Sequence, residues 1–73
     1  MNISQLQQKI GNRIRELRES KGISQQNLAA ICNFEKANLS RIEAGRTNPT
    51  VSTLYKISQA LEITLSELVN VEV

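Results

Sequence analysis

The chain has 73 residues, of which 40% are hydrophobic and only two are aromatic, so it has room for one domain with a single aliphatic core. With one cysteine, Cys32, and no histidine it excludes an internal disulfide and a Cys/His zinc site, and with no apolar run near ~20 residues it excludes a membrane-spanning helix. The net charge of +2 is unevenly spread. Residues 1–56 hold nine basic and four acidic side chains, whereas residues 57–73 hold three acidic ones and no basic one. This distribution indicates one polyanion-binding surface.

The first helix is predicted from about Gln5 to Lys21. Its apolar residues recur every three or four positions and form one stripe: Ile3, Leu6, Ile10, Ile14 and Leu17. Ser4 and Gln7 have the spacing of a capping box at its start, and Gly22 is suited to ending it in a left-handed turn. One face of this helix should therefore pack on the core, with most of its basic residues in solvent.

A second, shorter helix is predicted over residues 25–32, with Ser24 as its N-cap. The residues expected to face inward are Leu28, Ala29, Ile31 and Cys32. Asn33 follows, and asparagine adopts a left-handed turn more readily than most other residues with a side chain. Phe34 should then anchor the turn in the core, and Cys32 is expected to be a small core residue rather than a redox switch.

A third helix is predicted from Glu35 or Lys36 to Ala44, and Gly45 should end it. The only apolar residues in this helix are Ala37, Leu39 and Ile42. Leu39 and Ile42 should attach the helix to the core, which leaves one polar face exposed. Because about four residues separate the second and third helices, residues 23–45 have the geometry of a helix-turn-helix.

Two further helices are predicted after a polar loop that ends in Pro49. Thr50 should cap the fourth helix, over about residues 51–61, and Tyr55 in this helix is expected to pack. Thr64 and Glu67 have the spacing of a capping box and should open a short fifth helix over residues 65 to about 70. Five short helices joined by tight turns predict one all-α domain, a compact bundle with its core over about residues 5–70. The tail, residues 69–73, alternates apolar and polar side chains, and it is interpreted either as a frayed end or as an extended arm that adds to a partner.

The polar face of the third helix is suited to the major groove of DNA. A helix about 10–12 Å across fits that groove, where Lys and Arg can read guanine, Asn can read adenine and a methyl group can contact thymine. The residues expected to read bases are Lys36, Ala37, Asn38 and Arg41. The residues expected to contact phosphates, from the second helix, the third helix and the loop after it, are Gln25, Ser40, Arg46, Thr47 and Asn48. Together these residues predict an interface for double-stranded DNA.

Three segments of residues 10–68 follow the ordered spacing of a known family: IGNRIRELRESKGISQQNLA, LSRIEAGRTNPT and LYKISQALEITLSEL. They resemble the Xre family of helix-turn-helix regulators, the group of the lambdoid phage repressors and Cro. The resemblance implies a lambda-repressor-like domain of five helices whose third helix is the recognition helix. It also implies a transcriptional regulator that binds double-stranded DNA as a homodimer.

The resemblance also implies roles for single residues. It assigns DNA contacts to the positions named above other than Ser40, and it implies a partly buried ion pair with a structural role between Arg18 and Glu43. Three positions depart from the family pattern, and one of them is Asn33, which stands where the family usually has Gly in the turn. Glu35 stands where the family usually has Ser or Thr as the N-cap of the third helix, and Glu62 stands where it usually has Gly or a small polar residue.

An enzyme is not indicated by this sequence. Without histidine, aspartate or a glycine-rich loop it has few groups for acid–base, metal or phosphate chemistry, so no cofactor is expected. The first eight residues are mostly polar and unlike a signal sequence, and we expect a cytoplasmic location. The alternative function is a protein-interaction module of the same fold, such as an antitoxin that blocks a toxin or another regulatory protein, with DNA binding secondary. The apolar residues of the tail motivate that alternative.

Overall fold

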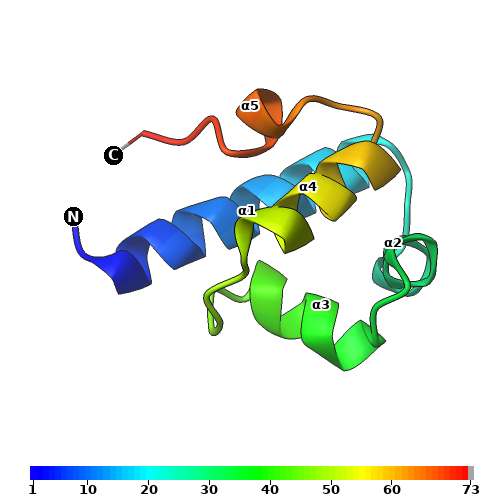
Figure 1. Cartoon of the computed structure of the whole chain (residues 1–73), viewed down its shortest axis with the longest axis horizontal. Coiled ribbons are helices and arrows are strands. Elements are labelled where there is room, and N and C mark those ends of the chain that lie inside the picture. Colours follow the sequence, from blue (N-terminus) through cyan, green and yellow to red (C-terminus); the bar gives the residue numbers. More distant parts are fainter. Residues whose placement is uncertain (73) are drawn as a thin grey trace.

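The computed structural model describes residues 1–72, which form five α-helices (Figure 1). Their bounds are α1 Ile3–Ser20, α2 Gln25–Cys32, α3 Lys36–Glu43, α4 Val51–Ala60 and α5 Leu65–Leu68. No strand occurs in this part of the chain, and the predicted all-α, five-helix fold is confirmed. Among the same residues, no helix combines the length and the apolar character that crossing a bilayer requires.

The longest helix, α1, crosses the molecule and packs against α3 on one side and α5 on the other (Figure 1). α2 lies beyond the C-terminal end of α1 and contacts α3 and α4, and α4 in turn contacts α5. Each helix contributes an aliphatic side chain that is fully buried: Ile14, Leu28, Leu39, Ile57 and Leu68. The core is therefore shared by all five helices, as expected for a chain with so few aromatic residues.

Polar side chains cap the starts of α1, α2, α4 and α5. The N-caps predicted at three starts are confirmed: Ser24, Thr50 and Thr64. The capping box predicted at Ser4 and Gln7 is wrong, because Asn2 and Gln5 form it instead. The Asn2 Oδ1 accepts from the Gln5 N–H at 2.8 Å, and the Gln5 Oε1 accepts from the Asn2 N–H at 3.0 Å. α1 thus begins two residues before the predicted start, at Ile3.

α1 to α4 end in the same kind of turn, each with one residue in the left-handed region: Gly22 (φ 68°), Asn33 (φ 59°), Gly45 (φ 73°) and Glu62 (φ 59°). In each turn the N–H of the next residue donates to the carbonyl five positions earlier in the chain, as from Ile63 to Ser58 at 3.0 Å. The ends predicted at Gly22, Asn33 and Gly45 are confirmed. The conformation of Glu62 is unfavourable, because a residue with a Cβ rarely adopts it.

Three apolar side chains that were expected to pack are exposed. Ile3 is 63% exposed, Ile31 is 61% exposed and Tyr55 is 52% exposed, so the three predictions are wrong. Residues 29–32 are all apolar, and because a helix turns by about 100° per residue they cannot all face the core. Ala29 and Cys32 take the buried positions. Phe34 is half-buried and packs against the core, as predicted.

Cys32 lies in the core of the bundle between α2 and α4. It is 7% exposed, and its Sγ lies 3.8 Å from the main-chain oxygen of Lys56. Burial raises the pKa of the Cys32 thiol, against a smaller opposite effect of the charge on Lys56. The thiol is thus kept in its protonated form, which fits a core residue better than a redox switch.

The C-terminal segment lies against the N-terminal half of α1. α5 ends two residues before the predicted boundary, and residues 69–72 continue beside α1 (Figure 1). The Lys9 Nζ donates to the Glu72 main-chain oxygen at 2.9 Å, and the Arg13 Nε and Nη2 donate to the Glu67 main-chain oxygen at 3.1 and 3.0 Å. Residues 67–72 are thus attached to their own domain rather than projecting as an arm, and Val73 lies outside the described residues.

Candidate nucleic-acid interface

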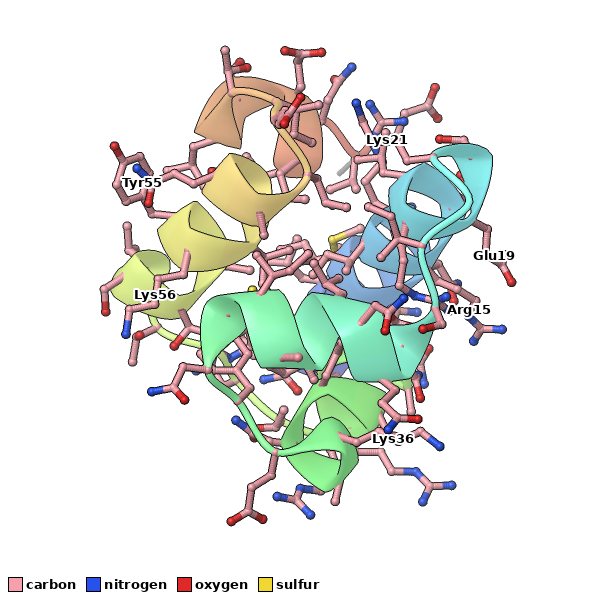
Figure 2. All side chains as sticks on the ribbon, turned by 90° about the vertical axis from the view of Figure 1, so that its right-hand side faces the viewer. Arg15, Glu19, Lys21, Lys36, Tyr55 and Lys56 are labelled. Carbon is pink, nitrogen blue, oxygen red and sulfur yellow. The ribbon has the colours of Figure 1, made fainter. Side chains whose placement is uncertain are left out.

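α3 has two faces that differ in burial. Its inner face consists of Leu39, Ile42 and Glu43, each no more than 3% exposed. Its outer face consists of the exposed residues Lys36, Ala37, Ser40 and Arg41. Residues three and four apart share one side of a helix, so the two sets point in opposite directions. In Figure 2, Lys36 extends from α3 at the edge of the molecule, whereas Tyr55 and Lys56 project from α4 on another side.

Ala37 lies at the centre of the outer face, because Ser40 and Arg41 follow it at three and four positions. A methyl group at this place lets another surface approach the helix backbone closely. Lys36 and Arg41 reach beyond it on their long side chains. Asn38 is half-buried and lies at the edge of the outer face. All four residues predicted to read bases are therefore accessible: three are exposed and Asn38 is half-buried.

Predicted phosphate contacts lie at both sides of α3. In the loop that follows it, Arg46 and Asn48 are exposed and Thr47 is half-buried. At the start of α2, Gln25 is half-buried. The structure therefore gathers the predicted contacts on three neighbouring places: the outer face of α3, the loop of residues 46–48 and the first turn of α2.

The interface carries an excess of positive charge. Within residues 20–61 the acidic side chains are Glu35 and Glu43, and Glu43 is buried in an ion pair. Glu35 is thus the one exposed carboxylate of this segment, which also carries the exposed cations Lys36, Arg41 and Arg46. It is the N-cap residue of α3, without a side-chain capping hydrogen bond, and its charge favours the helix start. The balance of charges suits a polyanion.

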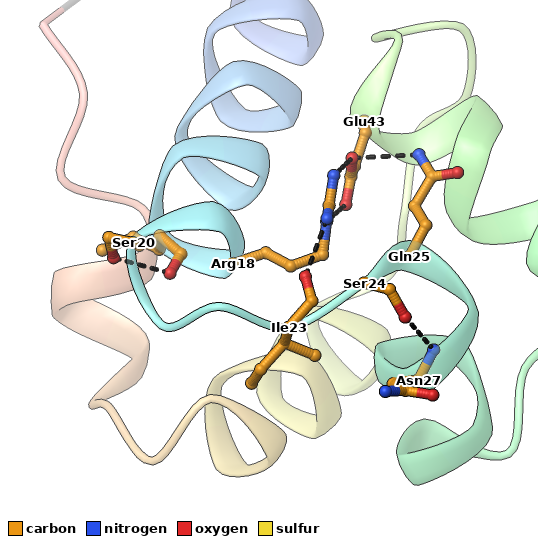
Figure 3. Close-up of polar contacts among 8 residues, drawn as sticks. Arg18, Ser20, Ile23, Ser24, Gln25, Asn27 and Glu43 are labelled. Atoms are coloured by element: carbon orange, nitrogen blue, oxygen red, sulfur yellow. Dashed lines mark hydrogen bonds and ion pairs between the residues drawn. The ribbon is translucent and has the colours of Figure 1, made fainter.

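A buried network joins the end of α3 to α1 and α2 (Figure 3). The Glu43 carboxylate accepts from the Arg18 Nε at 2.8 Å, from the Arg18 Nη2 at 3.1 Å and from the Gln25 Nε2 at 3.0 Å. The Arg18 Nη1 donates to the Ile23 main-chain oxygen at 2.8 Å. The hydrogen bond to Glu43 raises the pKa of Arg18 above its usual value, which keeps the guanidinium charged. The ion pair expected between Arg18 and Glu43 is thus present, with bidentate geometry.

The bond between Gln25 and Glu43 is not predicted from the sequence, which indicates only a phosphate contact for Gln25. One N–H of the amide points into the protein, and the second remains for an outside acceptor. Ser24 accepts from the Asn27 N–H, and the other N–H groups of the first turn lack an intrahelical partner, as at any helix start. The carboxylate of Glu43 therefore fixes the orientation of the Gln25 side chain at the start of α2.

Comparison with known proteins places this architecture among DNA-binding domains. Residues 14–68 match a family model described as Helix-turn-helix. The chain is 43% identical over 60 residues to the uncharacterized HTH-type transcriptional regulator y4dJ of Sinorhizobium fredii, covering 82% of this chain and 78% of that protein. It is 45% identical over 64 residues to the HTH-type transcriptional regulator SlrR of Bacillus subtilis, covering 86% of this chain but only 42% of SlrR.

Solved structures share the fold. The chain is similar to an HTH_3 family transcriptional regulator from Vibrio cholerae, with a TM-score of 0.86 and 34% identity over 92% of this chain and 38% of that one. It is also similar to SinR, a master regulator for biofilm formation, in a structure of SinR in complex with DNA. There the TM-score is 0.77 and the identity 37%, over 84% of this chain and 98% of that one.

Proposed function

Because the chain belongs to the helix-turn-helix family, we propose that it is a sequence-specific transcriptional regulator whose α3 enters the major groove of double-stranded DNA. The observation that carries this proposal is the division of α3 into two faces. The inner face anchors the helix in the core, and the outer face holds two long cations around a methyl group. That combination gives a helix that can lie deep in a groove while its neighbouring side chains reach base edges.

Each part of the interface has a separate role in this proposal. Lys36, Ala37, Asn38 and Arg41 read bases, with Arg41 donating two hydrogen bonds to a guanine. Other side chains position the protein on the backbone: Gln25, Ser40, Arg46, Thr47 and Asn48. The first turn of α2 adds its free N–H groups as donors to a phosphate. The positive end of the helix dipole favours a phosphate at this place.

A homodimer is part of the proposal. Two copies would present their α3 helices to successive major grooves about 34 Å apart on one side of the duplex. An operator with inverted half-sites would follow from that symmetry. A module for binding a toxin or another regulatory protein, with DNA binding secondary, is not favoured by the relatives, which are named as transcriptional regulators.

A gel-shift titration tests the proposal. The protein is titrated against a random-sequence duplex and against the DNA upstream of its own gene, each at a low and at a physiological salt concentration. We expect binding to both duplexes at low salt and to a specific site alone at the higher salt, because counterion release weakens the contacts to phosphates. Failure to bind either duplex at low salt would overturn the proposal.

Selection from a random duplex library then identifies the site. We expect an inverted repeat whose half-sites are about one helical turn apart. Sedimentation of the protein with the selected duplex should give two chains for each duplex. A selected site without symmetry, bound by one chain, would contradict the homodimer and leave the base-reading role of α3 intact.

A further inference from the structure

We propose that Gly11 is a positioning residue for DNA recognition: the absence of a side chain at this place in α1 sets how deeply α3 is seated and therefore where its outer face meets the groove. This inference rests on the proposed function. Gly11 lies in the middle of α1 and is buried, far along the chain from every residue expected to touch DNA.

The contact between Gly11 and α3 is formed by backbone atoms. A Cβ at position 11 would lie 2.5 Å from the Ile42 main-chain oxygen and 2.6 Å from that of Glu43. Both oxygens belong to the last turn of α3. Backbone atoms cannot rotate away as the end of a long side chain can, so a methyl group here has to displace the helix.

The position of Gly11 within a helix makes this contact informative. Glycine is among the least favourable residues in the middle of a helix, and Gly11 has the ordinary helical conformation that alanine would adopt more readily. Local structure therefore favours alanine at position 11. The close approach of α3 is the reason in the structure for glycine.

Two more contacts hold the same end of α3 against α1. Gly45 follows the helix, and a Cβ on it would lie 2.6 Å from the Cα of Gln8. The Glu43 carboxylate binds Arg18. The last turn of α3 is thus fixed at three points, and Gly11 lies between the other two along α1. A shift at Gly11 must therefore tilt or lift the helix rather than slide it freely.

The expected displacement is large on the scale of base recognition. Real Cβ atoms essentially never lie closer than 3.0 Å to such neighbours, so a contact of 2.5 Å has to open by at least 0.5 Å. Ser40 and Arg41 belong to the turn that moves. Because bidentate contacts to a base tolerate only about half an ångström of misplacement, the shift should disturb recognition by Arg41.

The test compares Gly11→Ala with Gly22→Ala. Gly22 ends the same helix with φ 68°, and a Cβ there would meet nothing within 4 Å. Both variants should lose stability, Gly11→Ala through a clash and Gly22→Ala through backbone strain, but only the first moves α3. Both are made in a Glu62→Gly background, which relieves the strained φ at residue 62, away from both sites.

Two measurements are made at a temperature where both variants are fully folded. We expect Gly11→Ala to shift the backbone amide resonances of residues 36–43, to lose roughly tenfold or more in affinity for the selected site and to keep its affinity for random duplex. Gly22→Ala should change the specific affinity by less than about twofold and leave the α3 resonances in place.

Each outcome decides between the alternatives. Equal specific affinities of the two folded variants would overturn the inference and leave the proposed function intact. A Gly11→Ala protein that stays unfolded in the Glu62→Gly background would also overturn it, since Gly11 would then be required for folding rather than for placing α3. If the parent protein binds no duplex, the proposed function fails and the positioning role with it, whatever the resonances show.

Discussion

The two faces of α3 belong to one helix of eight residues and have separate functions. The inner face places two aliphatic side chains and one paired carboxylate against α1 and α2, and the outer face makes no contact that the fold needs. Changes on the inner face should therefore alter the free energy of unfolding, and changes on the outer face should alter DNA binding alone. A helix divided in this way can acquire a new base preference without a loss of stability.

The largest expected effect comes from removing the partner of the inner-face carboxylate. Arg18→Met leaves Glu43 buried with only Gln25 as a donor, which should lower the free energy of unfolding by about 3–5 kcal/mol. A chain of 73 residues has a total stability on the order of 4–11 kcal/mol, so the variant would be near the limit of folding. Urea denaturation followed by circular dichroism measures the change.

The double variant Arg18→Met/Glu43→Met serves as the control. It removes the stranded charge and replaces it by packing, so it should recover most of the stability that the single variant loses. A single variant that loses less than about 1 kcal/mol would show that the pair is not effectively desolvated, and the contrast between the two faces would weaken.

The next effect tests the outer face. Arg41→Ala should weaken binding to the selected site by ~1–3 kcal/mol and relax the preference at one base pair, because a bidentate contact is lost. The free energy of unfolding should stay within roughly 0.5 kcal/mol of the parent protein, since Arg41 is exposed. Repeating the selection with this variant shows whether the preference changes. An unchanged preference would mean that the base-reading residues are assigned to the wrong face.

A smaller effect separates base reading from backbone contact. Arg46→Ala should weaken binding to all sequences by a similar factor, because a phosphate contact carries no sequence information. The slope of log K against log salt should decrease in magnitude by about 1. Titrations of specific and random duplexes over a range of salt give both quantities. A loss confined to the specific site would instead place Arg46 among the base-reading residues.

The smallest effect concerns a residue that belongs to neither face. Glu62→Gly should raise the free energy of unfolding by roughly 0.5–1 kcal/mol, because glycine adopts φ 59° without the strain of a side chain. This net gain already allows for the opposing effect of glycine, which increases the conformational entropy of the unfolded chain. Thermal unfolding measures the gain, and DNA affinity should not change. A destabilised variant would reveal a native contact of the Glu62 side chain that outweighs the backbone strain.

Much of this fold follows from local signals in the sequence. Ser24, Thr50 and Thr64 cap helices because their short oxygen-bearing side chains reach free N–H groups, and Asn33 and Gly45 end helices because they tolerate positive φ. These rules act over four residues or fewer and need no knowledge of the rest of the molecule.

The errors arise where two local patterns are equally good or where distant elements decide. Asn2 with Gln5 and Ser4 with Gln7 have the same capping-box spacing, and only the path of the backbone selects the first pair. The spacing of apolar residues does not distinguish Ile31 from Cys32, because both occupy a short helix that is apolar on several sides.

The same limit applies to the candidate site. The outer face of α3 is recognisable from the sequence because it is a polar stripe next to two buried aliphatic residues. The bond from Gln25 to Glu43 spans 18 positions, and the contact of Gly11 with α3 spans more than 30. Neither has a signal in its own neighbourhood, apart from the presence of a glycine in a helix that does not need one.

The burial of Cys32 has a practical consequence for spectroscopy. A protonated thiol inside the bundle reacts slowly with alkylating reagents, and the chain has no second cysteine. A thiol introduced on the outside, for example by Ser52→Cys at an exposed place on α4, would therefore accept a fluorescent or spin label at a single known position. Because the native thiol should remain unlabelled, the distance between the introduced label and a labelled duplex can be measured without a second signal from the protein.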